Sequence, residues 1–89
     1  MAPTMNSPAS ILVRSDELDR RGPYKRERRR QLELVELYPP RIVLNRRTNV
    51  WVRAEVEAWE RARAAGATDD QVRELVRQMV AERAQGVRR

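Results

Sequence analysis

Two helix-breaking dipeptides, Gly22-Pro23 and Pro39-Pro40, restrict what the first half of the chain can form. Proline has no backbone N–H to donate and its ring fixes φ, so it interrupts a helix interior but suits the first turn of a new helix. The 89 residues are therefore expected to form short elements around one small, thin core.

The segments on either side of Gly22-Pro23 predict a helix, a tight turn and a second helix. Ser15 is expected to cap the first helix, over 16–21, because its hydroxyl can accept a hydrogen bond from the first turn. Asp16 and Glu17 come next, where the helix dipole favours carboxylates. This part of the chain therefore predicts a helix-turn-helix.

The second helix is expected over 24–36, ending before Pro39-Pro40. Helical spacing divides its side chains between two faces. The face predicted to meet the core consists of Tyr24, Leu32 and Val35, with Leu37 near the end. The opposite face is predicted to be an outward cationic stripe of Lys25, Arg26, Arg29 and Arg30.

Residues 41–52 change period and predict a β-hairpin. Two β-prone runs, 41–44 and 50–52, flank a polar loop over 45–49. The loop carries Arg46 and Arg47 and no acidic residue, so we expect a positively charged tip.

A third helix is expected over about 54–64, ending near Gly66. Val56 and Trp59 share one face, and Glu57 and Arg61 are spaced for an ion pair one turn apart. Trp51 before this helix and Trp59 within it are expected to be core residues and not base-stacking platforms.

The fourth helix is predicted over 69–84, opened by a capping box at 68–71 (Thr-Asp-Asp-Gln). Its apolar stripe consists of Val72, Leu75, Val76, Met79 and Val80. The stripe allows three interpretations: pairing with the same helix of a second copy, contact with an integrase or polymerase, or packing back on its own domain. It spans about two heptads, too short for an independent coiled coil.

The charge distribution indicates an acidic partner. The net charge is +6, but residues 20–53 alone carry eleven bases against three acids, a net of +8. Five of the bases lie within six residues, Lys25, Arg26, Arg28, Arg29 and Arg30. The plainer interpretation of this run is a solvated helix face.

Residues that are absent narrow the chemistry. The chain has no cysteine and no histidine, which removes disulfides, thiolate metal sites, cysteine nucleophiles and histidine general bases. We therefore expect no enzyme, no cofactor, no metal site and no small-molecule ligand. The carboxylates Glu55, Glu57, Glu60, Asp69 and Asp70 are expected to face arginines or helix N-termini. With no apolar run of membrane length and no signal pattern, we expect a cytoplasmic location and no membrane partner.

The order helix, turn, basic helix, Tyr38-Pro39-Pro40, hairpin and the motif W-x-R-x-E-V-E-A-W at 51–59 resembles the AlpA family of phage regulators and the related excisionases. These are small winged-helix proteins of the MerR-like type. The resemblance covers residues 11–65, and it implies that 24–34 enters the DNA major groove while the 45–49 loop touches a minor groove or the backbone. The family usually has Ser or Thr at the start of the recognition helix and an apolar residue in its middle. In this chain those two places fall near Lys25 and Arg29, which depart from the family pattern.

The expected fold is mainly α with a small β-hairpin: a winged helix-turn-helix plus an additional C-terminal amphipathic helix. The expected organisation is a flexible tail (1–10), a DNA-binding domain (11–66), the amphipathic helix (67–85) and a basic tail (86–89). The DNA-binding residues are predicted to be Lys25, Arg26, Arg28, Arg29 and Arg30 on the recognition helix and Arg46 and Arg47 on the wing.

Three functions fit this prediction. The first is an architectural double-stranded DNA-binding protein, an excisionase or recombination directionality factor that assists the integrase of a phage or mobile element and self-associates on DNA. The second is an AlpA-like transcriptional regulator that binds a promoter. The third is an adaptor whose arginines meet an acidic protein. The small size and the absence of an effector-binding segment favour excision.

Overall fold

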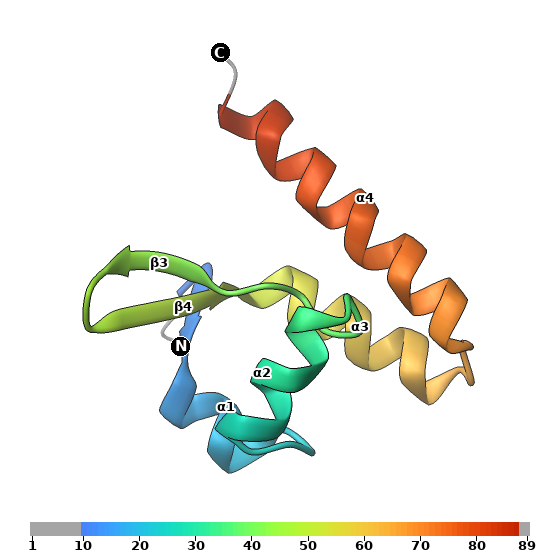
Figure 1. Cartoon of the computed structure of the whole chain (residues 1–89), viewed down its shortest axis with the longest axis horizontal. Helices are drawn as coiled ribbons and strands as arrows, with labels where there is room; N and C mark the ends of the chain where they lie inside the picture. Colours follow the sequence, from blue (N-terminus) through green and yellow to red (C-terminus); the bar gives the residue numbers. More distant parts are fainter. Residues whose placement is uncertain (1–9, 88–89) are drawn as a thin grey trace, which may run out of the picture.

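The computed structural model describes residues 10–87, which form four helices and a three-stranded antiparallel sheet (Figure 1). In chain order the elements are β2 (Leu12–Arg14), α1 (Ser15–Arg21), α2 (Arg26–Leu34), β3 (Ile42–Asn45), β4 (Thr48–Val52), α3 (Arg53–Ala64) and α4 (Asp69–Val87). The expectation of a mainly helical chain with a small β-hairpin is confirmed. Residues 1–9 of the predicted flexible tail and 88–89 of the basic tail lie outside the described residues. None of the described helices is long and apolar enough to cross a membrane.

The sheet contains one strand more than the hairpin that the sequence predicts. Its order is β2-β4-β3, so β4 is central, and β2 pairs with it through Val13 opposite Trp51. The hairpin places Ile42 opposite Val50 and has a bulge between Val43 and Asn45. β2 is only three residues long, and its partner is almost forty residues away, so its formation depends on tertiary contact.

The first helix begins at Ser15, but Ser15 is not its cap. Arg14 holds the cap position without a side-chain hydrogen bond, and the Ser15 hydroxyl instead accepts a hydrogen bond from Arg29 at 2.7 Å. The capping prediction is therefore wrong, because a guanidinium from α2 reaches Ser15.

The second helix is shorter than the predicted 24–36. It ends in a Schellman motif: Leu37 N–H donates to Leu32 O at 2.8 Å, Glu36 N–H donates to Glu33 O at 3.1 Å, and Glu36 has a φ of 64°. This reversal leaves Val35 48% exposed and returns Leu37 to the core at 8%. The prediction that Val35 faces inward is wrong for that reason.

The third and fourth helices follow their predicted signals closely. α3 ends in a second Schellman motif, with Gly66 at a φ of 86°. The capping box forms as expected, since Thr68 N–H donates to Gln71 Oε1 at 2.9 Å and Gln71 N–H donates to Thr68 Oγ1 at 3.2 Å. α4 continues to Val87, three residues beyond its predicted end. No ion pair joins Glu57 and Arg61, both of which the structure describes.

The core lies where α1, α2, α3, α4 and the sheet meet. Trp51 is 1% exposed and Trp59 is 2% exposed, so the prediction that both are core residues is confirmed. Trp59 Nε1 donates to Leu37 O at 2.9 Å, and its ring meets Tyr38 edge-on at 4.7 Å between centroids. Burial raises the pKa of Tyr38 to about 12.

The apolar stripe of α4 packs against its own domain. Val72, Val76 and Met79 are buried, Leu75 is half-buried, and Val80 remains 44% exposed. The structure therefore shows the third interpretation of this stripe, packing back on the chain, and most of the surface proposed for pairing is already covered.

Candidate nucleic-acid interface

A basic groove lies between α2 and the β3–β4 hairpin. It consists of two adjoining hollows that share Arg26 and Arg41, one of about 220 Å³ and one of about 630 Å³. The smaller hollow is lined by Arg14, Ser15, Asp16, Arg26, Arg41, Arg47, Thr48, Asn49 and Trp51. The larger is lined by Asp19, Lys25, Arg26, Glu27, Arg30 and Arg41. Six arginine and lysine residues on or beside α2, β2 and the hairpin thus border the two hollows, which together we call the basic groove.

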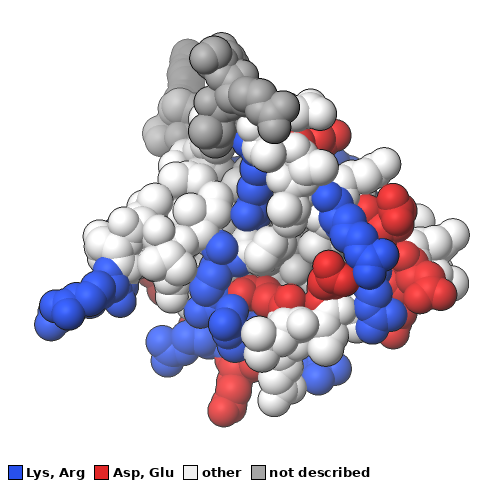
Figure 2. Space-filling model, turned by 45° about the horizontal axis from the view of Figure 1, so that its top comes forward, with Lys and Arg blue, Asp and Glu red and all other residues white. Residues whose placement is uncertain are grey.

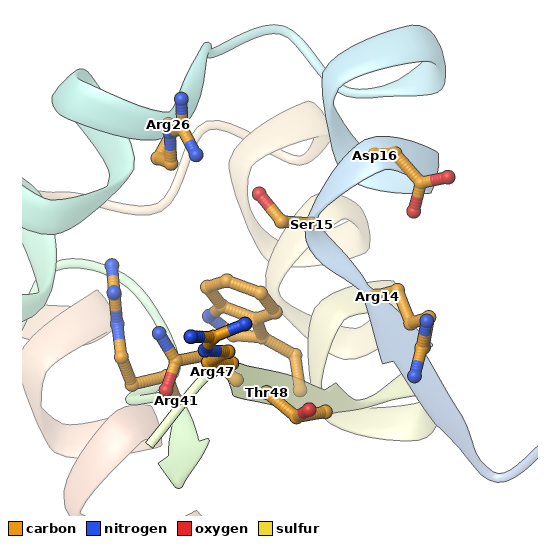
Figure 3. A pocket seen from close by; sticks show the side chains of 9 residues that line it. Arg14, Ser15, Asp16, Arg26, Arg41, Arg47 and Thr48 are labelled. Carbon is orange, nitrogen blue, oxygen red and sulfur yellow. The ribbon is translucent and has the colours of Figure 1, made fainter. Parts of the chain in front are cut away.

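The two walls of the smaller hollow bring arginines toward each other. Arg26 borders it from α2, while Arg41 and Arg47 border it from the hairpin side; the carboxylate of Asp16 points away (Figure 3). Within residues 10–87, the side chains of Arg14, Arg26 and Arg47 form no ion pair. Their positive charge is available to an anionic ligand.

The basic run on α2 does not form a single stripe. Arg26 and Arg30 are four residues apart and both line the larger hollow. Arg28 lies about 200° around the helix from Arg26. Its guanidinium donates to Gln31 Oε1 at 3.3 Å and lies 6.0 Å from the centre of the Tyr24 ring. The run therefore divides into a groove side and a far side.

Arg29 is buried, with 1% exposure, and the prediction that it lies in the outward stripe is wrong. Its Nη1 donates to Asp19 Oδ1 at 2.8 Å and to Tyr24 O at 3.0 Å, and its Nη2 donates to Ser15 Oγ at 2.7 Å. The guanidinium carbon lies 5.2 Å from the centre of the Trp51 ring. Position 29 shares the buried face of α2 with Leu32, and α1 supplies the acceptors that make burial of the charge possible.

The contact with Arg29 also changes the pKa of Asp19 on α1. The hydrogen bond from Arg29, together with its positive charge, holds the pKa of Asp19 below the ordinary value of 3.8, against the opposing effect of desolvation. Asp19 therefore remains ionised at neutral pH, and the pair joins α1 to α2 under the groove.

A buried carboxylate, Glu33, organises the floor of the groove. Its side chain is 2% exposed and accepts hydrogen bonds from Arg41 Nε at 2.8 Å, Trp51 Nε1 at 3.0 Å and Arg30 Nη1 at 3.3 Å. Arg41 is thereby largely covered, at 17% side-chain exposure, whereas Arg30 remains 52% exposed. Glu33 thus links α2 to the hairpin and still leaves Arg30 accessible.

The remaining predicted site residues are all exposed. Lys25 lies immediately before α2, and its ammonium group donates a hydrogen bond to Asp19 O at 2.8 Å. Arg46 and Arg47 form the β3–β4 turn, where Arg47 N–H donates to Asn45 Oδ1 at 2.9 Å. Basic side chains project from the left edge of Figure 2, the end of the molecule where Figure 1 places this turn.

Arg14 and Arg41 line the groove although neither was among the predicted site residues. Arg14 arrives there through the pairing of β2 with β4, in which it lies opposite Val50. Arg41 precedes β3 and is turned inward by Glu33. The only signal for Arg41 in the sequence is its place within the basic stretch 20–53, and Arg14 has none, because both positions depend on contacts far along the chain.

The groove offers charge and hydrogen-bond donors, the properties that bind a polyanion. In the part of the chain from 10 to 87, no three His, Cys, Asp or Glu side chains are grouped to hold a metal ion. Comparison with protein-family models, curated proteins and solved structures found no match. The site must therefore be interpreted from its own geometry.

Proposed function

We propose that this chain is a double-stranded DNA-binding protein of the winged helix-turn-helix type, and not an enzyme. In this proposal α1 and α2 are the helix-turn-helix, α2 enters the major groove, and the β3–β4 hairpin is the wing that meets the backbone. The observation that carries the proposal is the basic groove, where arginines without ion-pair partners in the described residues border a channel between helix and hairpin.

In this proposal the predicted residues have different roles. Arg26 and Arg30 on the groove side of α2 are proposed to read bases, since a guanidinium can donate two parallel hydrogen bonds to guanine. Lys25 and Arg28, and the wing residues Arg46 and Arg47, are proposed to contact phosphates. Arg29 has no direct contact in this scheme, because its guanidinium is buried among α1 and α2.

The aromatic residues favour duplex DNA over single-stranded nucleic acid. Single strands are bound largely by stacking of bases on exposed aromatic rings. Trp51, Trp59 and Tyr38 are buried, and Tyr24 is half-buried against the core. No fully exposed aromatic ring is present in residues 10–87.

For the biological process, the proposal is an architectural factor that helps an integrase excise a mobile element, with promoter regulation as the alternative. Bending a site of 20–30 base pairs costs on the order of 1–6 kcal/mol, more than one small module readily sustains, so several copies should bind side by side. Circular-permutation gel shifts on direct repeats should then show sharp multi-copy complexes and a bend. A single copy or one two-fold dimer on an unbent site would favour the promoter regulator.

The DNA-binding proposal is tested by the salt dependence of affinity. If about five phosphates are engaged, log K should fall with log salt with a slope near −4 to −5. The assay is fluorescence anisotropy with labelled duplex, using a site selected from a randomised library and a random duplex of equal length. A slope close to zero, together with retained binding to an acidic protein, would replace DNA binding by the adaptor function.

The wing variant Arg46→Ala with Arg47→Ala should reduce that slope by about 2 without lowering the melting temperature. The matched control is Arg61→Ala, which removes an exposed arginine of α3 that makes no ion pair within residues 10–87. The control removes one charge and the wing variant removes two. If the control reduces the slope by half as much as the wing variant does, the effect comes from net charge and the basic groove is not the interface.

A further inference from the structure

Three arginines on α4 bind the segment that connects α2 to β3. Arg73 Nε donates to Val35 O at 3.0 Å, and Arg77 Nη2 donates to Glu36 Oε1 at 2.9 Å. Arg83 Nη2 donates to Pro40 O at 2.8 Å, and the same guanidinium makes a two-pronged ion pair with Glu55 of α3. These contacts span 28 to 43 residues of sequence, so they hold distant parts of the chain together.

The connecting segment contains a residue that its backbone does not favour. Glu36 has a φ of 64°, the left-handed conformation at which glycine is usual, and Gly66 fills the equivalent place at the end of α3. The carboxylate of Glu36 pairs with Arg77, whose hydrogen bond and charge lower the pKa of Glu36. A glycine would relieve the backbone but would lose this contact with α4.

The inner side of the same segment is held by α3. Trp59 donates to Leu37 O, and Tyr38 packs edge-on against the Trp59 ring. The connecting segment is therefore bound on one side by α3 and on the other side by α4. Because α2 ends at Leu34 and β3 begins at Ile42, it is also the covalent link between the two walls of the basic groove.

We propose that α4 is a brace that sets the spacing between α2 and the hairpin, so that Arg77 and Arg83 are positioning residues for DNA binding although they do not touch DNA. This inference rests on the proposed function of the basic groove. Of the two, Arg83 is the stronger anchor, since its side chain is 24% exposed and that of Glu55 is 11%, whereas Arg77 and Glu36 are both about half exposed. A ligand that needs both walls of the groove would bind tightly only when the brace is intact.

The test uses a brace variant that carries both Arg77→Gln and Arg83→Gln. Its control is Arg61→Gln, which replaces an exposed arginine of α3 by the same residue. With the selected duplex, the brace variant should lose about tenfold in affinity, within the range typical of coupling between distant sites. Its salt slope should stay within about 0.5 of wild type, because no phosphate contact is removed, whereas the wing variant loses about 2. Unchanged affinity would overturn the proposal, and a slope lowered as in the wing variant would show that these arginines touch DNA directly.

Two further measurements separate positioning from simple loss of folding. The charge exchange Glu36→Arg with Arg77→Glu restores an opposite-charge pair and should recover most of the affinity lost by Arg77→Glu alone. Hydrogen exchange of the free protein should be faster at amides of 35–45 in the brace variant than in the Arg61→Gln control. If the wild-type protein binds no DNA, the proposed function fails, and the brace is then tested by hydrogen exchange alone. Unchanged exchange at amides of 35–45 in the brace variant would overturn the brace.

Discussion

The basic run at 25–30 and the hairpin turn at 46–47 carry similar side chains but use them differently. In the basic run, Lys25 and Arg29 donate to Asp19 of α1, while Arg28 and Arg30 donate to Gln31 and Glu33 of α2 itself. At the turn, the guanidinium groups of Arg46 and Arg47 make no hydrogen bond or ion pair within residues 10–87. A run of basic residues therefore does not mean that every charge in it is available: Arg29 is buried and paired, whereas Arg26 on the same helix forms no ion pair within residues 10–87.

The difference follows from distance to the core. α2 lies against α1 and β4, which place Asp19, Ser15 and Trp51 beside its arginines, and its own Glu33 turns inward. The hairpin turn extends beyond the body of the molecule (Figure 1), and both Arg46 and Arg47 are exposed there. Burying a charge is costly unless it is paired, and pairing in turn removes the charge from the binding surface.

The largest effect is expected at the buried member of the basic run. Arg29→Met should lower the free energy of unfolding by about 2–4 kcal/mol, because it keeps much of the volume but leaves Ser15 and Asp19 without their donor. Urea denaturation followed by circular dichroism measures this loss. Arg28→Met is the matched control and should stay within about 0.5 kcal/mol of wild type. Equal effects of the two variants would contradict the contrast between buried and exposed arginines.

The next effect concerns DNA and compares two exposed arginines of the same helix. Arg26→Ala should cost about 1–3 kcal/mol on the selected duplex and little on random duplex, since Arg26 lies in the basic groove. Arg28→Ala, on the far side of α2, should weaken binding to both duplexes by a similar, smaller amount. Anisotropy titrations at one fixed salt concentration measure both. Loss of selectivity in the Arg28 variant instead would show that the opposite side of α2 faces the bases.

The smallest effect is a dependence of stability on acid pH. Arg29 lowers the pKa of Asp19 below 3.8, and the hydrogen bond from Arg53 lowers the pKa of Glu17 below 4.5. The unfolded chain therefore binds more protons, so this stabilisation is fully present above about pH 4.5 and is lost as the pH falls through the lowered values. Urea midpoints measured from pH 7 to pH 3 should decline only in the acid range. In Asp19→Asn the decline should be shallower, and an identical decline would remove Asp19 from this account.

The sequence alone determined those features whose cause lies within a few residues. The proline and glycine breaks, the capping box at 68–71, the hairpin and the burial of both tryptophans were all predicted correctly. In each case the hydrogen bonds or the alternation involved are local, or the side chain is large and apolar enough that burial is favoured in almost any fold.

Which arginines are available, and which surface α4 covers, depend instead on contacts between residues far apart in the sequence. Arg29 meets Ser15 fourteen residues away, Trp51 meets Glu33 across eighteen, and Arg83 meets Glu55 across twenty-eight. β2 likewise exists only because β4 is beside it. A local pattern shows that a side chain is charged, but the side-chain acceptors of Arg29 come from another element, so the availability of its charge depends on how the elements pack together.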